Sequence, residues 1–146
     1  MGVADDAAVE IRAQGWRRLA ALHGRIETAL ERALSAQFEL SVVEYTVLDA
    51  LSRQDGWHMR MQQVGRAAAL SPSAITRLVT RLENRNLLVR CICPDDRRGI
   101  YTELTAEGRA LLASAAPVHD KILQEALEEA REVPELTDLA DHIRGH

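Results

Sequence analysis

Residues 70–108 read LSPSAITRLVTRLENRNLLVRCICPDDRRGIYTELTAEG, and this stretch decides the fold. It predicts a helix that begins at Ser71-Pro72. A serine hydroxyl can accept a hydrogen bond from an amide of the first turn, and a proline at the first helical position removes no needed donor. Two strand-like runs follow, at residues 87–93 and 100–104, with a turn sequence between them. The stretch therefore predicts a helix followed by a β-hairpin.

The predicted helix has two chemically different faces. Its apolar residues recur at spacings of three and four, which gathers Ile75, Leu78, Val79 and Leu82 on a side that must pack on a core. The opposite side carries hydroxyl and guanidinium groups able to contact phosphates and base edges in a major groove. The alternative is the solvent-exposed side of an ordinary amphipathic helix. We expect a DNA-recognition surface formed by Ser71, Ser73, Ala74, Thr76, Arg77, Thr80 and Arg81.

The turn between the two strands carries two adjacent arginines, Arg97 and Arg98, followed by Gly99. A hairpin tip of this kind can reach into a minor groove, although a solvated turn arginine is the alternative. Asp96 would meet DNA against its own charge, so we expect it to orient Arg98 or to cap the turn. Together with a positioning helix over 59–69, these elements predict a winged helix-turn-helix.

The wing pattern resembles that of the MarR family, the multiple antibiotic resistance regulators. Its hallmark is an acidic-basic-Arg wing followed by Leu-Thr and Gly, matched here by 96–98, 104–105 and Gly108. The resemblance extends over almost the whole chain, because residues 37–45 (QFELSVVEY) are similar to the family's loop and second helix. It implies a DNA-binding transcriptional regulator, mostly a repressor, with Arg98 as the wing arginine.

The same resemblance implies an effector site, because family members bind effectors between the dimerisation helices and the winged lobe. Trp16, His23 and Tyr45 could line such a pocket for a small aromatic or phenolic compound. The alternative is that His23 and Trp16 are packed and hydrogen-bonded at the dimer interface.

The chain ends carry long apolar seams that a winged lobe alone cannot cover. A predicted helix over 9–37 has heptad spacing, and a second helical region follows over 109–146. The simplest partner is a second copy, so we expect a twofold homodimer with recognition helices roughly 34 Å apart and a pseudo-palindromic operator of double-stranded DNA. The fold class is mainly α with a small β-hairpin wing. One domain spans 1–146, with the winged lobe at 41–108 and dimerisation helices on both sides. The heptad positions are Trp16, Leu19, His23, Ile26, Leu30, Ala33 and Gln37.

Charge distribution agrees with DNA binding better than total charge does. The net charge is −4, yet residues 53–109 hold ten arginines against six acidic residues, a local net of +4. No stretch approaches the roughly 20 apolar residues that span a bilayer, and the first residues lack a basic-then-apolar signal pattern. We expect a cytoplasmic protein without a membrane partner.

Cys91 and Cys93 are one residue apart on a predicted strand and would share a face. Such a pair can be a redox sensor or half of a metal site, and the alternative is two small hydrophobic residues. The resemblance does not favour sensing, because thiol-sensing members use a cysteine near the amino terminus. His58, His119, His142 and His146 lack zinc-site spacing, so no metal or cofactor is expected.

No catalytic motif is present: the sequence lacks a nucleophile elbow, a phosphate-binding glycine loop and a zinc-protease motif. The sequence predicts no enzyme but a dimeric, sequence-specific DNA-binding regulator, expected to be a repressor relieved by a small-molecule effector. Two alternatives stay open. One is a redox- or metal-responsive regulator that senses through Cys91 and Cys93, and the other is a protein-interaction module on a winged-helix scaffold.

Overall fold

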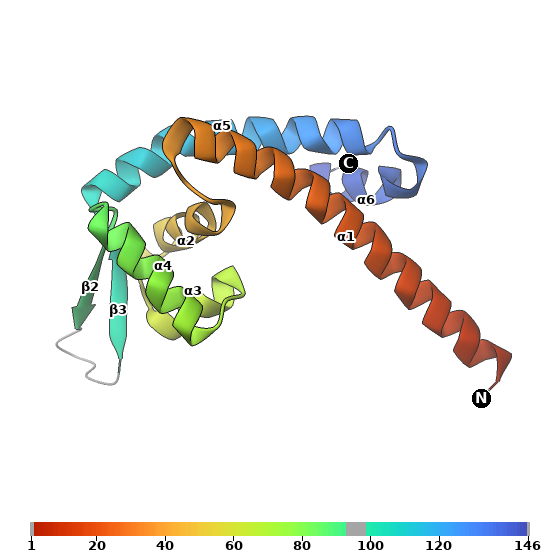
Figure 1. Ribbon diagram of the computed structural model, residues 1–146, viewed down its shortest axis with the longest axis horizontal. Coiled ribbons are helices and arrows are strands. Elements are labelled where there is room, and N and C mark those ends of the chain that lie inside the picture. The colour runs from red at the N-terminus through yellow and green to blue at the C-terminus, as the bar shows by residue number, and fades with distance from the viewer. Residues whose placement is uncertain (1, 93–98, 146) are drawn as a thin grey trace. The chain divides into compact units, whose positions relative to one another are not determined.

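The computed structural model describes residues 2–92 and 99–145, and the chain divides into two compact units (Figure 1). One unit combines residues 1–33 with 118–146, and the other is 34–117. Two long helices, α1 (Val3–Phe38) and α5 (Ala106–Ala130), contribute residues to both units.

The 34–117 unit contains the predicted helix-turn-helix and wing strands. Its helices are joined to a small antiparallel sheet, and a short 3₁₀ turn precedes the first strand. The elements are α2 (Val42–Ser52), η1 (Asp55–Trp57), β1 (His58–Arg60), α3 (Met61–Ala68), α4 (Pro72–Asn84), β2 (Leu88–Ile92) and β3 (Ile100–Leu104).

An aliphatic core holds these helices and the sheet together. The apolar stripe of α4 is confirmed, because all four of its predicted residues are at most 3% exposed. Leu48 and Leu51 of α2 and Val64 of α3 are fully buried in the same cluster. Burying a side chain of this size stabilises the fold by about 1.5–3 kcal/mol, so the stripe fixes which face of α4 remains outside.

Side-chain caps fix the starts of α2 and α4, as the sequence predicts. Ser41 and Glu44 form a complete capping box, in which each side chain accepts a hydrogen bond from the other residue's amide. Ser71 accepts a hydrogen bond from the Ala74 amide, and Pro72 occupies the first turn. Both helices therefore begin at a defined residue.

The sheet has three strands in the order β1-β3-β2, whereas the sequence predicted a two-stranded hairpin. β1 pairs antiparallel with β3, with Met59 opposite Thr102. β2 pairs with the other edge of β3, with Arg90 also opposite Thr102. The predicted helix over 59–69 is therefore wrong at its start, because Met59 lies in a strand and α3 begins at Met61.

The first residues of α5 make two close contacts with residues next to the sheet. Trp57, which has a left-handed φ of 56°, stacks on the Arg109 guanidinium at 3.9 Å from the ring centroid. Gly108 lies against the chain that leads into β2. A Cβ atom at this position would overlap the Leu87 carbonyl oxygen and the Leu104 side chain. The first turn of α5 is thus packed tightly on residues that flank the wing strands.

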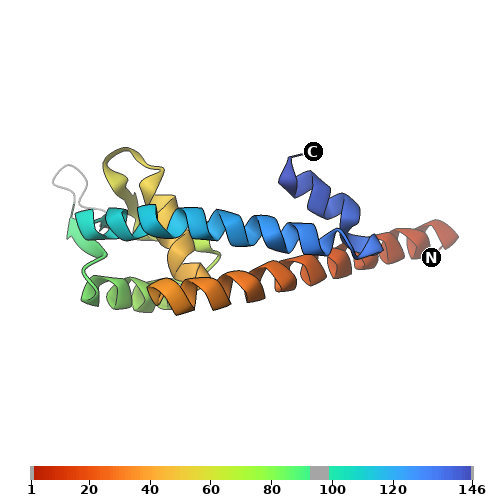
Figure 2. The same cartoon turned by 90° about the horizontal axis from the view of Figure 1, so that it is seen from above.

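The other unit is helical. α1 and the end of α5 pack together around Leu22, Leu127 and Ala130, and α6 (Thr137–Arg144) folds back after η2 (Pro134–Leu136) (Figure 2). Arg144 holds α6 through an ion pair with Glu128 at 2.6 Å.

The long helices differ in detail from the expected ranges. α1 begins at Val3, earlier than the expected residue 9, and α5 runs as one helix through Pro117. No helix in the described part of the chain is both long and apolar enough to cross a membrane. Several large apolar side chains of α1 are exposed within the single chain: Val3, Val9, Ile11, Trp16 and Leu19.

Candidate nucleic-acid interface

The outer side of α4 presents most of the residues predicted to contact DNA. Ser73, Thr76 and Arg77 are exposed, whereas Ala74 is half-buried. Arg77 has no hydrogen-bond or ion-pair partner among the described residues, so its guanidinium is available. Arg81 is also exposed, but its Nε lies 3.9 Å from the Glu44 carboxylate.

The hydroxyl protons of the two threonines of α4 are already used within the helix. Thr76 Oγ1 donates to the Pro72 carbonyl and Thr80 Oγ1 to the Thr76 carbonyl, each at 2.9 Å. Ser71 Oγ accepts the capping hydrogen bond. The two threonine hydroxyls can therefore meet a ligand mainly as acceptors, whereas the capping bond leaves the Ser71 proton unused. Arg77 is the charged donor on this face without an internal partner among the described residues.

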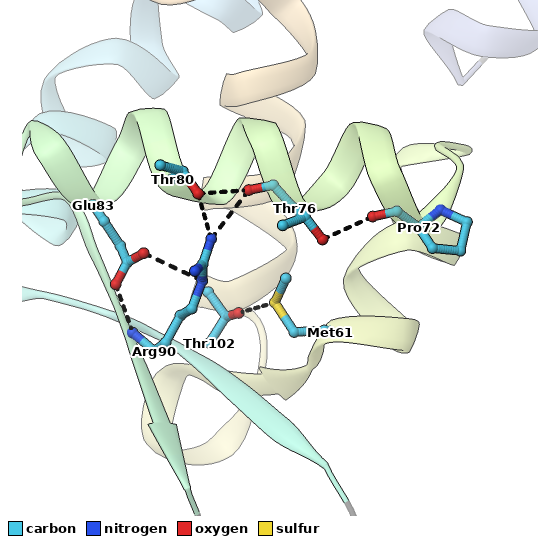
Figure 3. A network of polar contacts seen from close by, with 7 residues as sticks. All are labelled: Met61, Pro72, Thr76, Thr80, Glu83, Arg90 and Thr102. Atoms are coloured by element: carbon cyan, nitrogen blue, oxygen red, sulfur yellow. Dashed lines mark hydrogen bonds and ion pairs between the residues drawn. The ribbon is translucent and has the colours of Figure 1, made fainter.

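Arg90 of β2 lies in a polar network that the sequence did not reveal (Figure 3). Its Nη2 donates to the Thr76 carbonyl at 3.1 Å and to the Thr80 hydroxyl. Its Nε lies 3.2 Å from a Glu83 carboxylate oxygen, and its backbone amide donates to the other oxygen. A strand residue thus binds α4 at three places.

The wing tip falls mostly outside the described residues. Asp96, Arg97, Arg98 and Cys93 belong to this segment, so the roles proposed for them stay predictions. Gly99 is half-buried and is followed directly by β3. The strands that carry the tip are therefore in the predicted place.

The face of the sheet turned away from α4 carries a cluster of polar and aromatic side chains that the sequence analysis missed. Arg60 Nε donates to the Tyr101 hydroxyl at 3.1 Å, and its guanidinium lies 5.7 Å from the centre of that ring. The His58 ring meets Tyr101 edge-on at 5.4 Å. Cys91 is half-buried and pairs with Tyr101 in the strand register. The redox role proposed for Cys91 and Cys93 stays untested.

The three predicted effector-pocket residues have different environments. Trp16 is 67% exposed on α1, and His23 is exposed and ion-paired with Glu27 at 3.3 Å. Tyr45 is 6% exposed and belongs to the core of the 34–117 unit. The pocket therefore stays a prediction. Among the described residues, no group of three or more His, Cys, Asp or Glu side chains could hold a metal ion.

A hollow of about 590 Å³ lies between α3 and α4. It is lined by Met61, Gln62, Gly65, Arg66, Ala69, Leu70, Pro72, Ile75 and Thr76. A second, smaller hollow of about 300 Å³ lies between α4, the start of α3 and the strands, and Thr76, Arg90 and Ile100 contribute to its wall. Both hollows adjoin the outer side of α4.

A capped recognition helix, a positioning helix before it and a strand pair after it define a winged helix-turn-helix protein. Comparison with known proteins finds a family that resembles part of the chain. A model described as "MarR family" matches residues 38–99. The helix-turn-helix and the strands of this part of the chain are therefore similar to those of the MarR family.

Two curated relatives are named as transcriptional regulators. The chain is 33% identical over 91 residues to the transcriptional regulator HosA of Escherichia coli O111:H-, which covers 61% of this chain and 64% of HosA. It is 32% identical over 88 residues to the HTH-type transcriptional regulator MhqR of Bacillus subtilis (strain 168), covering 60% and 59%. The chain thus spans less than two thirds of the length of these two relatives.

Two solved structures from Streptomyces coelicolor match nearly all of the chain. Sco3205, a MarR family transcriptional regulator crystallised in complex with DNA, gives a TM-score of 0.74 at 26% identity, covering 99% of this chain and 86% of that one. AbsC, also a MarR family transcriptional regulator, gives a TM-score of 0.74 at 29% identity, covering 100% and 98%. The match supports the mainly helical winged fold predicted from the sequence.

Proposed function

We propose that this protein is a sequence-specific DNA-binding transcriptional regulator that acts in the cytoplasm as a homodimer. The main support is the exposure of the two sides of α4: Arg77 and Ser73 on the outer side are exposed, and the apolar side is buried. We place α4 in the major groove and the arginines of the wing at the minor groove. The crystallisation of the similar protein Sco3205 with DNA supports this assignment.

The proposed dimer is supported by the apolar surface of α1. Trp16 is 67% exposed, Leu19 48% and Val9, seven residues before Trp16, 54% in the single chain. Large apolar side chains at heptad spacing are typical of a helix that packs on another helix. A second copy would cover them and supply the second recognition helix, which requires a pseudo-palindromic operator.

We further propose that the protein is a repressor relieved by a small aromatic effector. A ligand can lower operator affinity by favouring a dimer whose recognition helices no longer match the spacing of the two half-sites. Trp16, His23 and Tyr45 are the residues we assign to the effector site. The test of an effector is therefore the operator affinity with and without the compound. A compound that binds the protein and leaves this affinity unchanged does not act in the proposed way.

The first test is a titration of the purified protein against a duplex from the intergenic region beside its own gene. A scrambled duplex is the control, and each titration is made at two salt concentrations. We expect tight, salt-dependent binding that prefers the intergenic duplex, because phosphate contacts supply affinity and base contacts supply selectivity. If the protein binds both duplexes equally, the titration is repeated with fragments of the neighbouring promoters. Equal binding to those fragments and to the scrambled duplex contradicts the proposal.

A further inference from the structure

We propose that Arg90 is a positioning residue that ties the wing to the recognition helix and so sets how the two meet DNA. The inference rests on the proposed DNA-binding function. It concerns a contact within the 34–117 unit, between β2 and the outer side of α4.

The contacts of Arg90 span most of α4. Nη2 binds Thr76 and Thr80 in the middle of the helix, and Nε binds Glu83 in its last turn. The Glu83 carboxylate also accepts the Arg90 amide, so it holds the strand backbone as well as the side chain. The strand is therefore fixed at two successive turns of α4.

Thr80 is oriented to take part in this arrangement. Its hydroxyl proton is donated to the Thr76 carbonyl, which leaves the oxygen lone pairs for the Arg90 guanidinium. The Thr76 carbonyl accepts from both side chains. Thr80 therefore acts as a support for Arg90 rather than as a group that meets the DNA bases.

The place of Arg90 in the strand connects this arrangement to the wing. Arg90 pairs with Thr102 in the register, and β2 ends at Ile92, after which the chain enters the 93–98 segment with its two arginines. In the proposed complex α4 occupies the major groove and the wing meets the adjacent minor groove. A rotation of β2 relative to α4 at Arg90 would move the wing away from that minor groove. A fixed relation between two DNA-contacting elements lowers the cost of ordering them on binding.

The competing role for Arg90 is direct contact with a phosphate. Its side chain is 33% exposed and that of Glu83 is 30% exposed, so the pair is shielded but not sealed from solvent. The two roles differ in salt dependence. A guanidinium that neutralises a phosphate contributes to the slope of log affinity against log salt, whereas one that binds α4 does not.

The test compares Arg90→Ala, Arg90→Lys and the parent protein on the operator duplex over a series of salt concentrations. We expect both variants to lose about tenfold or more in affinity while the salt slope stays that of the parent, because lysine lacks the planar fork needed to bind Thr76, Thr80 and Glu83 together. Arg53→Ala removes the arginine that directly follows α2. Its side chain is 72% exposed and paired with Asp49, so this control should change neither quantity.

Two results would overturn the positioning role. One is an Arg90→Lys protein with parental affinity, and the other is an Arg90→Ala slope that falls by about 0.9, the value for one phosphate contact. Circular dichroism at the assay temperature verifies that each variant is fully folded. A parent protein that does not prefer its operator refutes the proposed function instead, which separates the two failures.

Substitutions of Thr80 provide a second test, in which operator affinity is again measured. A role of Thr80 in folding alone would leave the operator affinity of the folded variants unchanged. Thr80→Ser keeps the hydroxyl and should retain parental affinity. Thr80→Val should lose only part of the affinity that Arg90→Ala loses, because Arg90 keeps its contacts with Thr76 and Glu83. The double variant Thr80→Val/Arg90→Ala should lose no more than Arg90→Ala alone, because both changes remove the same contact. Additive losses would show that the two residues act independently and would contradict the proposal.

Discussion

Arg77, Arg81 and Arg90 differ in what surrounds their guanidinium groups. Arg77 is exposed without a partner among the described residues, Arg81 lies near Glu44, and Arg90 is bound to α4. The guanidinium of Arg77 can therefore meet DNA without first breaking an internal contact. This difference makes Arg77 the best residue for a direct test of DNA contact.

We expect Arg77→Ala to weaken operator binding and to reduce the salt slope by about 0.9 if the side chain contacts one phosphate. If Arg77 instead reads a base edge, the loss should be about 1–3 kcal/mol and should fall on one operator position. Titrations with single-base operator variants distinguish these cases. Parental affinity and slope in Arg77→Ala would remove Arg77 from the interface.

Replacing Gly108 by alanine should lower the free energy of unfolding, whereas the same change at an exposed helical glycine should raise it. Gly108→Ala would place a Cβ atom against the Leu87 carbonyl and should lower the free energy of unfolding by roughly 1–3 kcal/mol. Gly24→Ala on α1 meets no atom within 4 Å and should raise it by about 0.5–1 kcal/mol, because alanine favours helix. Urea denaturation measures both, and equal effects would contradict the close contact at Gly108.

The N-caps of α2 and α4 allow the effect of a cap on stability to be distinguished from its effect on DNA binding. Ser41→Ala and Ser71→Ala each remove one capping hydrogen bond and should each lower the free energy of unfolding by about 1 kcal/mol. Only Ser71→Ala should also weaken operator binding, because it loosens the first turn of the recognition helix. Equal operator affinity in the two variants would contradict the placement of that turn at the DNA.

Local signals in the sequence predicted α4 and β3 correctly. Ser71-Pro72 determines where α4 begins, and the spacing of its apolar residues determines which face is buried. β3 has the predicted bounds at 100–104. β1 was missed because three residues are too few to show a strand period, and its pairing with β3 joins segments far apart in the sequence.

The network around Arg90 could not be predicted for a related reason. Its partners Glu83, Thr80 and Thr76 lie 7, 10 and 14 residues away, across the turn between α4 and β2. An arginine inside a strand run has no local pattern that distinguishes a bound side chain from a solvated one. The outer face of α4 was predictable, but its connection to the wing required the tertiary structure.

The proposed homodimer predicts a clear response to charge on α1. Leu19→Glu places a carboxylate on the exposed apolar side of the helix and should shift the protein toward monomer in sedimentation velocity experiments. Operator affinity should fall with it, because a monomer holds one half-site. Arg17→Glu, which removes only the exposed pair with Glu10, is the control and should remain dimeric. A dimeric Leu19→Glu protein would contradict the proposed seam.

The two tryptophans lie in different compact units. Trp16 is exposed on α1 in the unit of residues 1–33 and 118–146, and Trp57 stacks on Arg109 in the 34–117 unit. Because the chain has no other tryptophan, the Trp16→Phe and Trp57→Phe proteins each contain a single intrinsic fluorophore. Emission from each during denaturation therefore follows one unit at a time, and shows without any label whether the two unfold together or in succession.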